Sequence, residues 1–448
     1  MLFVEGLAML RQLIGQVQEL LDVYGSPFPP PFPTAPLPHH HLPTIFAPPS
    51  QLRNDRWCFV NLEENDDCYD VVMRGGKLKM LGESRISKRA RKLAESPSKE
   101  AMEDEIWKEF PEDLHEAVIA RLPVATFFRF RSVCQKWNSL LTSSSFSIEC
   151  SRLPNPQQPW FYTSHENINT GEIYDPVAGK WHHPTAPAIP TKMIILPMAA
   201  AGGLVCFLDI GHRSFYVCNP LTRSFKELKG SRSVRVWSRV AVGMSVKQGG
   251  YGYVIMWVGS EGEYEVYDSA IDSWTCPGNI KVTLPLSLNF RSQSVSVDGW
   301  IYFLRSDPDG IVGYDVETGN WKQFTVPAPV HLSDQTLAEC GGRIMLVGLL
   351  RKNAATCVCI WELQKMTLLW KEVDRMPNVW CLEFYGKHIK MSCLGNRGLL
   401  LLSLRSKMMN RLVTYNVFTK EWLKVPNSRN PQSIACGTAF HPCLTAKA

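Results

Sequence analysis

The sequence has no stretch that is long and apolar enough to cross a membrane, because no run of about 18 apolar residues occurs in it. Its N-terminal segment is interrupted by Glu5, Arg11 and Glu19 and has no basic start, which excludes a secretory signal. The net charge is only +6 over 448 residues, so no strongly basic surface for nucleic acid is expected. We therefore expect a soluble protein of the nucleus or cytoplasm, with no direct contact to a membrane or to nucleic acid.

The sequence also lacks paired cysteines and every common catalytic motif. Its 14 cysteines are scattered without CxxC spacing, so we expect reduced thiols rather than a zinc site or a disulfide framework. It contains no GK[ST] or GxGxxG phosphate loop, no HExxH motif and no GxSxG motif. We therefore predict no catalytic residues, no metal and no cofactor. What remains is a chain of ordinary globular composition, long enough for two or more folded units.

Residues 1–25 predict one amphipathic helix. Apolar residues recur at alternating steps of four and three positions from Phe3 to Tyr24, which is the seam of a helix that pairs with another helix. The same seam equally suits a short helix that packs on its own protein. Gly25 and Pro27 end the pattern.

Residues 26–104 favour a disordered linker. The first part is rich in proline and the second part in charge, and neither composition supports a packed core. The histidine run His39–His41 stands in the proline-rich part, where it is not expected to bind metal. The basic cluster from Arg85 to Lys92 resembles a nuclear import signal, although such clusters also occur in plain linkers.

Residues 105–150 predict a small all-α domain. Leu114, Ile119 and Leu122 share one helical face, and Pro123 ends that helix and lets a second one begin. The second helix is again rich in apolar residues, and so small a unit of about 40 residues is marginal without help. Either the unit packs on its own protein, or its apolar surface belongs to a partner.

This segment resembles an F-box domain. The resemblance rests on Phe110-Pro111, Leu114, Ile119, Arg121-Leu122-Pro123-Val124, Arg129-Phe130-Arg131, Val133-Cys134, Trp137 and Leu140-Leu141. Many members of the family carry leucine at the place of Phe110. F-box domains bind the Skp-type adaptor of cullin–RING (SCF) ubiquitin ligases. The resemblance implies that eight residues form or support that contact, namely Pro111, Leu114, Ile119, Leu122, Pro123, Val124, Val133 and Trp137.

After this segment the sequence repeats with a period of 44 to 52 residues. Each unit closes on an aromatic residue, and these are Trp181, Phe225, Trp274, Trp321, Trp370 and Trp422. In five units a pair such as Tyr314-Asp315 stands seven residues before the closing aromatic residue. In the fifth unit Trp361-Glu362 stands nine residues before it, which predicts a turn longer by two residues. Units two to six also carry glycines ahead of an apolar strand.

These units predict an all-β propeller over residues 155–446. Their period, their glycines and their closing tryptophans resemble kelch repeats, and radial stacking lets each sheet bury both of its faces. Six units predict about six blades, with a seventh, degenerate blade left open. The first unit is short, and we expect the tail Ile434–Phe440 to complete it and close the ring. The closing tryptophans are expected in the core between blades.

Three longer segments between the units, at 231–247, 277–292 and 376–388, are the candidates for binding a partner. Tryptophan and arginine dominate binding hot spots when they are exposed. The alternative is that these aromatic side chains only cover the ends of the blades. The candidate substrate-binding residues are Arg235, Trp237, Arg239, Asn289, Phe290, Arg291, Asn378 and Trp380.

The whole chain is therefore predicted to be multidomain, with a largely disordered N-terminal region, an F-box and a kelch-type propeller. This layout resembles that of plant F-box/kelch-repeat proteins. The resemblance implies a non-catalytic subunit of an SCF ubiquitin ligase in plant development, whose F-box binds the adaptor and whose propeller binds an unidentified protein substrate for degradation. Two alternatives stay open, namely a scaffold or transcriptional co-factor outside any ligase, and a propeller enzyme of oxidase type.

Overall fold

The computed structural model describes residues 112–152, 158–165, 168–183, 195–209, 214–228, 239–247, 252–280, 287–352, 354–407, 409–426 and 434–448. These residues belong to one compact unit, Pro111–Ala448. The predicted helix at 1–25 and the predicted linker at 26–104, with its histidine run and basic cluster, lie outside the described residues. Among the helices that the structure describes, none is long and apolar enough to span a membrane.

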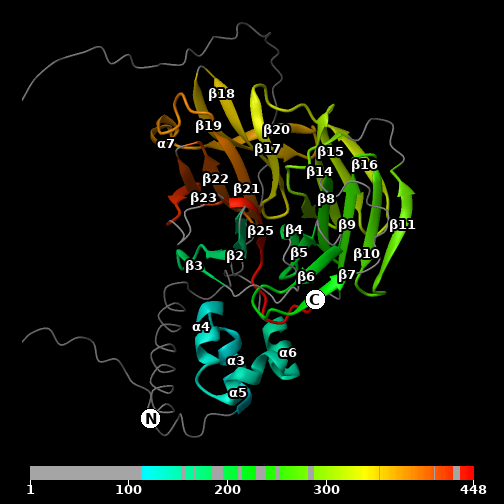
Figure 1. Ribbon diagram of the computed structural model, residues 1–448, viewed down its shortest axis with the longest axis vertical. Coiled ribbons are helices and arrows are strands. Elements are labelled where there is room, and N and C mark those ends of the chain that lie inside the picture. The colour runs from blue at the N-terminus through cyan, green and yellow to red at the C-terminus, as the bar shows by residue number, and fades with distance from the viewer. Residues whose placement is uncertain are drawn as a thin grey trace, which may run out of the picture. The chain divides into compact units, whose positions relative to one another are not determined.

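The first described segment is helical (Figure 1). It consists of α3 (Glu112–Ala120), α4 (Val124–Phe130), α5 (Gln135–Asn138), the 3₁₀ helix η1 (Ser139–Thr142) and α6 (Ser144–Arg152). Pro123 separates α3 from α4, as predicted, and takes the N-cap position of α4 with φ −53°, near the backbone angle that the proline ring imposes. Cys134 caps α5, because its sulfur accepts a hydrogen bond from the Trp137 N–H at 3.5 Å.

A small aromatic core holds these helices together. Phe127 of α4 and Phe146 of α6 are fully buried, and their rings stack with centroids 5.4 Å apart. Phe130 stacks in the same way on Trp137 of α5, at 5.1 Å. Each such pair stabilises a fold by about 1 kcal/mol beyond the burial of its area. The helices of this segment therefore depend on a few aromatic contacts.

The other described residues form six antiparallel sheets, each of which is one blade of a propeller. Blade 1 consists of β25 (Ile434–Phe440), β1 (Trp160–His165), β2 (Ile168–Asp175) and β3 (Lys180–His182). Blade 2 consists of β4 (Ile195–Ala201), β5 (Leu204–Asp209), β6 (Ser214–Cys218) and β7 (Phe225–Leu228). Blade 3 consists of β8 (Val240–Val246), β9 (Tyr253–Gly259), β10 (Glu263–Asp268) and β11 (Ser273–Asn279).

The remaining three blades complete the ring (Figure 1). Blade 4 consists of β12 (Ser287–Leu288), β13 (Val295–Val297), β14 (Trp300–Asp307), β15 (Asp309–Asp315) and β16 (Trp321–Thr325). Blade 5 consists of β17 (Leu332–Glu339), β18 (Ile344–Lys352), β19 (Ala355–Gln364) and β20 (Leu369–Arg375). Blade 6 consists of β21 (Lys390–Asn396), β22 (Leu399–Arg405), β23 (Asn410–Asn416) and β24 (Glu421–Lys424), and α7 (Asn378–Leu382) precedes it.

The innermost strands form a closed ring. The strands β25, β4, β8, β13, β17 and β21 each contact the next one, and β21 contacts β25. The predicted fold class, a small helical domain followed by a six-bladed propeller, is therefore confirmed. Radial repetition of this kind leaves only short, protected sheet edges around the axis.

The strand β25 closes the ring, as the sequence predicted. It pairs with β1 in antiparallel register, with Trp160 opposite Phe440 and Tyr162 opposite Thr438. The inner strand of blade 1 thus comes from the far end of the chain, so no tight turn joins it to β1. This explains why the first repeat unit has no glycine pair.

The closing aromatic residues lie on the outermost strands, each opposite the residue seven positions earlier. These pairs are Tyr174 with Trp181, Cys218 with Phe225, Tyr267 with Trp274, Tyr314 with Trp321 and Tyr415 with Trp422. The predicted longer turn in the fifth unit is wrong, because Trp370 lies opposite Leu363 and Leu369 opposite Gln364. Blade 5 therefore keeps the common turn length and carries Leu-Gln at the place of Tyr-Asp.

The turns between the first and second strands explain the recurring glycines. Asp298 (φ 52°) and Gly299 (φ 78°) join β13 to β14, and Gly341 (φ 57°) and Gly342 (φ 76°) join β17 to β18. Two successive positive φ angles make the hairpin turn that matches strand twist, and glycine adopts them without strain. The local sequence thus determines these turns.

The acid of each aromatic–acid pair shapes the turn before the outermost strand. The Asp315 Oδ1 atom accepts hydrogen bonds from the N–H groups of Glu317 and Thr318 at 3.0 and 3.3 Å. Asp175 and Asn416 make the same contacts in their own blades. A side chain that binds the backbone two residues ahead stabilises a tight turn, which is why this position recurs as Asp or Asn.

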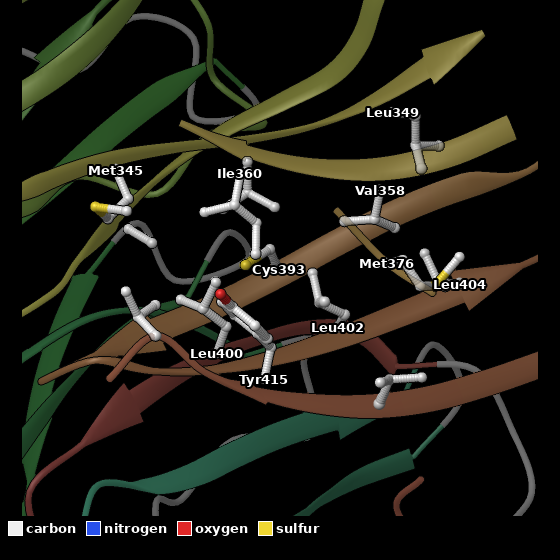
Figure 2. Packing of buried hydrophobic residues seen from close by; sticks show 14 of the residues in the cluster. Met345, Leu349, Val358, Ile360, Met376, Cys393, Leu400, Leu402, Leu404 and Tyr415 are labelled. Carbon is white, nitrogen blue, oxygen red and sulfur yellow. The ribbon is translucent and has the colours of Figure 1, made fainter. Parts of the chain in front are cut away.

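Apolar clusters fill the space between neighbouring blades. Figure 2 shows the cluster between blades 5 and 6, where Val358 and Ile360 of β19 lie near Leu400 and Leu402 of β22. Trp422 packs against this cluster. The tryptophans that close the other blades are also partly buried against such clusters. The predicted position of the closing tryptophans in the core between blades is therefore confirmed.

Candidate functional site

The helical segment exposes apolar side chains that its own core leaves uncovered. Leu114 of α3 is 45% exposed and Ile148 of α6 is 52% exposed. Val133 and Trp137 are half-buried, and Pro123 is exposed. Exposed leucine and isoleucine side chains in so small a unit are a candidate contact surface for a partner.

Three of the eight residues predicted for the adaptor contact are buried. Ile119, Leu122 and Val124 are only 1%, 3% and 3% exposed, so their side chains support the surface from inside. Val124 belongs to a cluster that also contains Trp160 of β1. Pro111 lies outside the residues whose side chains are described. The adaptor contact itself stays a prediction, in which Leu114, Pro123, Val133 and Trp137 are the members that reach the surface.

The predicted substrate-binding residues lie in three separate connections of the propeller. Arg239 is exposed directly before β8, and Arg235 and Trp237 lie outside the described residues. Asn289, Phe290 and Arg291 lie between β12 and β13, where the Asn289 amide nitrogen donates to the Gln335 carbonyl oxygen at 3.4 Å. Asn378 and Trp380 lie on α7. Their shared role in substrate binding stays a prediction.

The segment around α7 carries an exposed apolar surface. Val379 is 74% exposed, Leu382 is 71% exposed and Tyr385 is 60% exposed, whereas Trp380 packs against the core between blades 5 and 6. Val379 and Leu382 lie three positions apart on α7, so they share one side of it, and Tyr385 lies in the turn that follows. We call these three residues the α7 surface. The sequence-based search for exposed tryptophan and arginine selected Trp380 and its neighbour Asn378. It missed the α7 surface, although the regular spacing of these three apolar residues is present in the sequence.

Ion pairs fix the segment behind the α7 surface. The Glu383 carboxylate accepts hydrogen bonds from Arg411 Nε at 3.0 Å and from Lys424 Nζ at 3.1 Å. Partial burial opposes its ionisation, but the hydrogen bond from Lys424 and the charge of Arg411 hold the pKa of Glu383 below its usual range. The Gly386 N–H also donates to the Ala354 carbonyl oxygen at 3.0 Å. The segment is therefore tied to both blade 5 and blade 6.

Basic side chains outnumber acidic ones around the α7 surface. The residues compared are 374–391, the turn between β18 and β19 that Gly386 contacts, and the residues that form ion pairs or hydrogen bonds with these segments. The basic residues among them are Arg351, Lys352, Arg375, Lys387, Lys390, Arg411 and Lys424. The acidic residues are Asp334, Glu372, Asp374 and Glu383. The local field is therefore positive. A positive field favours acidic partners through electrostatic complementarity.

Polar side chains line the axis of the propeller. The Ser294 hydroxyl donates to the Val242 carbonyl oxygen at 2.8 Å, and the Leu337 N–H donates to the Ser292 hydroxyl oxygen at 2.9 Å. These two bonds join blade 4 to blades 3 and 5. The inner ring is therefore held by hydrogen bonds as well as by apolar packing.

A cavity of about 320 Å³ opens on the axis, and Ser245, Asn396, Arg397 and His441 are among the residues that line it. His441 is 7% exposed, and its ring nitrogens have no hydrogen-bond partner among the described residues. Burial, with a smaller effect of the Arg397 charge, lowers the pKa of His441 to about 4. The imidazole is therefore neutral at neutral pH. The cavity lies at the small end of the range for ligand pockets.

The described residues include no group of three or more His, Cys, Asp and Glu side chains that could hold a metal ion. His182, the last residue of β3, and His183, which follows it, each contact an acidic residue of blade 1. His183 Nδ1 lies 3.2 Å from Glu172 Oε1, and His182 Nε2 lies 3.8 Å from Asp175 Oδ2. These histidines therefore connect the outermost strand to its own blade.

Two family models match the two folds. Residues 107–149 match the model described as the F-box domain, and residues 166–381 match the model described as the F-box associated beta propeller domain. The chain is also 57% identical to F-box only protein 6 of Arabidopsis thaliana, over 99% of this chain and 100% of that protein. This chain belongs to the F-box protein family.

More distant relatives match about three quarters of this F-box protein. Protein UNUSUAL FLORAL ORGANS of Arabidopsis thaliana is 25% identical over 74% of this chain and 81% of that protein. An F-box/kelch-repeat protein of the same plant is 25% identical over 77% of this chain and 89% of that protein. The propeller matches the F-box associated model, so the kelch-repeat description stays an interpretation of the sequence period.

Proposed function

We propose that this F-box protein is the substrate-recognition subunit of an SCF-type ubiquitin ligase. The observation that carries the proposal is the presence of separate exposed apolar surfaces on the two folds, around Leu114 on the F-box and around α7 on the propeller. One surface suits the adaptor and the other a substrate. Such a subunit needs no catalytic group, because a substrate held near the ubiquitin-charged enzyme reacts faster through proximity alone.

The proposed substrate contact is the α7 surface. Its apolar centre, Val379 with Leu382 and Tyr385, is highly exposed, and the charge around it is positive. Interfaces combine an apolar centre with a polar rim, and complementary charge gives them specificity. The proposed substrate therefore presents an acidic segment that carries apolar side chains.

Retention of a purified Skp-type adaptor by the immobilised full-length protein tests the F-box role. The wild-type protein is expected to retain the adaptor, and Leu114→Asp is expected to weaken retention at least about tenfold, because it places a charge in a desolvated apolar contact. Val177→Asp is the matched control, since Val177 is 74% exposed in a turn of blade 1. A wild-type protein that retains no adaptor would rule out the ligase role.

The alternative function is a scaffold or transcriptional co-factor outside any ligase. The α7 surface favours it as much as it favours the ligase, because that surface would serve any acidic partner. The adaptor experiment separates the two functions. A protein that binds partners through α7 but retains no adaptor would support the scaffold.

We further propose that the bound substrate is degraded by the proteasome, in the nucleus or cytoplasm, and that this acts in plant development. The name of one relative, Protein UNUSUAL FLORAL ORGANS of Arabidopsis thaliana, supports the developmental role. Proximity labelling with and without proteasome inhibition tests the proposal. Proteins that accumulate around the propeller only under inhibition are the expected substrates, and an unchanged set of labelled proteins would refute degradation.

A further inference from the structure

Three cysteines meet where α7 packs on blade 5. Cys357 and Cys359 lie on β19, and Cys381 lies on α7. The sulfurs of Cys357 and Cys381 lie 3.8 Å and 3.5 Å from one and the same atom, the Met376 carbonyl oxygen. Residues 24 positions apart in the chain are thus brought together by the contact between α7 and β19.

Two of these three cysteines are more exposed to solvent than the buried cysteines of the propeller. Cys357 and Cys381 are half-buried, whereas Cys206, Cys359 and Cys393 are buried. Burial raises the pKa of the Cys206 and Cys393 thiols, which keeps them protonated and unreactive. Reagents from solvent therefore have better access to Cys357 and Cys381.

The surroundings of Cys357 favour its thiolate. Hydrogen bonds from the Cys359 and Cys381 thiols to its sulfur lower the pKa of Cys357, and the nearby charge of Arg375 adds to this effect, while burial opposes it. The same contacts raise the pKa of Cys359 and Cys381. Cys357 is thus the candidate nucleophile of this cluster. A thiolate beside a second accessible thiol is the arrangement of a redox-sensitive cysteine.

We propose that Cys357 and Cys381 form an oxidant-sensitive thiol pair, in which Cys357 reacts first with hydrogen peroxide and Cys381 then closes a disulfide. This modification goes beyond the proposed ligase function and does not depend on it. Val379 and Leu382 of the α7 surface lie on the same helix as Cys381, so the new bond forms beside a candidate substrate contact.

The chemistry balances in two steps. The Cys357 thiolate attacks one oxygen of hydrogen peroxide, the O–O bond breaks, and the product is a sulfenic acid with release of hydroxide, which takes a proton to become water. The Cys381 sulfur then attacks the Cys357 sulfur, the S–O bond breaks, and the Cys381 proton leaves with the hydroxyl as water. Two thiols are oxidised by two electrons and one peroxide is reduced to two waters.

The test exposes the reduced full-length protein to hydrogen peroxide and maps its peptides without reductant. The expected product joins the Cys357 peptide to the Cys381 peptide, with the loss of two hydrogen atoms. Cys150 is the internal comparison, because it is half-buried but burial raises its pKa to about 11. A bond from Cys357 to Cys359, or oxidation of Cys150 ahead of Cys357, would overturn the proposal.

The variant Cys381→Ser keeps the nucleophile and removes its partner. It is expected to accumulate a sulfenic acid at Cys357, which dimedone traps, and to give no joined peptides. Equal trapping at Cys150 would count against a special reactivity of Cys357. This variant alters a half-buried residue of a short helix, so a loss of folding would be visible as a lowered unfolding temperature and is separable from the chemistry.

The pH profile of alkylation by iodoacetamide gives a second readout on the unmodified protein. The rate at Cys357 is expected to change less than about twofold between about pH 6 and pH 8, because its thiolate is already formed in that range. The rate at Cys150 is expected to rise about tenfold per pH unit, because its thiolate fraction is still growing. A Cys357 rate that rises as steeply as that of Cys150 would overturn the proposal.

Discussion

The Asn219 side-chain amide donates a hydrogen bond to the Cys443 carbonyl oxygen at 2.9 Å. It also donates to the Ala446 carbonyl oxygen at 3.0 Å, while its own oxygen accepts from the Leu221 N–H at 3.0 Å. Asn219 therefore shapes the turn of blade 2 and also binds the tail that follows β25. Blades 1, 3 and 4 carry aspartate at this position, and aspartate has no proton to donate to a carbonyl.

Asn219→Asp is expected to lower the free energy of unfolding by about 2–3 kcal/mol, because it leaves two carbonyl groups without their donor and faces them with a carboxylate. Urea unfolding at pH 7 measures the loss. The reciprocal control is Asp315→Asn, which keeps the turn acceptor at a half-buried position and is expected to cost less than about 1 kcal/mol. Equal losses in the two variants would show that the contact with the tail contributes nothing.

Gly203→Ala tests the same tail from the other side. Gly203 has φ +86°, and an added Cβ would lie 2.4 Å from Cys443 Cβ. The control is Gly342→Ala, where φ is +76° and no atom lies within 4 Å of the added Cβ. Both variants carry backbone strain of about 1–2 kcal/mol, so the excess loss in Gly203→Ala measures the clash. An excess below about 0.5 kcal/mol would mean that the tail moves away freely.

Stability is expected to fall as the pH is lowered from about 6.5 to 4, because of His441. Its folded-state pKa, about 4, lies below the usual histidine pKa of 6.5, so the unfolded chain binds this proton first and acid favours unfolding. The contribution is complete above pH 6.5 and its full loss is about 3 kcal/mol. Urea unfolding at pH 7 and at pH 4.5 measures it.

His441→Gln is the comparison for that pH dependence, because glutamine stays neutral throughout. Its stability is expected to change less between the two pH values than that of the wild-type protein. Arg397 and Glu339 also line the cavity and carry charge, and both remain in the variant. Identical pH dependence in the two proteins would assign the acid sensitivity to other groups.

Leu382→Asp is expected to reduce recovery of the substrates that accumulate under proteasome inhibition by about tenfold, since it charges the centre of the α7 surface. Adaptor retention should not change, because Leu382 belongs to the propeller. The matched control is Ile271→Asp, at an apolar residue that is 62% exposed in the turn before β11 of blade 3. Substrate recovery that falls equally in both variants would place the contact elsewhere.

The two folds and the closure of the ring were predictable from the sequence alone. Pro123 separates two helices because its ring restricts the backbone locally, and the paired turn residues Asp298 and Gly299 adopt positive φ angles for an equally local reason. The tail Ile434–Phe440 was assigned to blade 1 because the first unit was one strand short. Each of these inferences rests either on residues that are neighbours in the chain or on a comparison of the repeat units with one another.

Contacts between residues far apart in the chain became visible only in the folded structure. The register of β19 and β20 places Leu363, rather than Trp361, opposite Trp370. The length of the turn sets this pairing, whereas Trp361-Glu362 only resembles the aromatic–acid pairs of the other blades. The contact of Asn219 with Cys443 spans 224 positions and exists because the ring closes. The thiol pair and the α7 surface depend in the same way on the packing of α7 against blade 5. Spacing along a chain does not encode such contacts, since they depend on how separate elements pack.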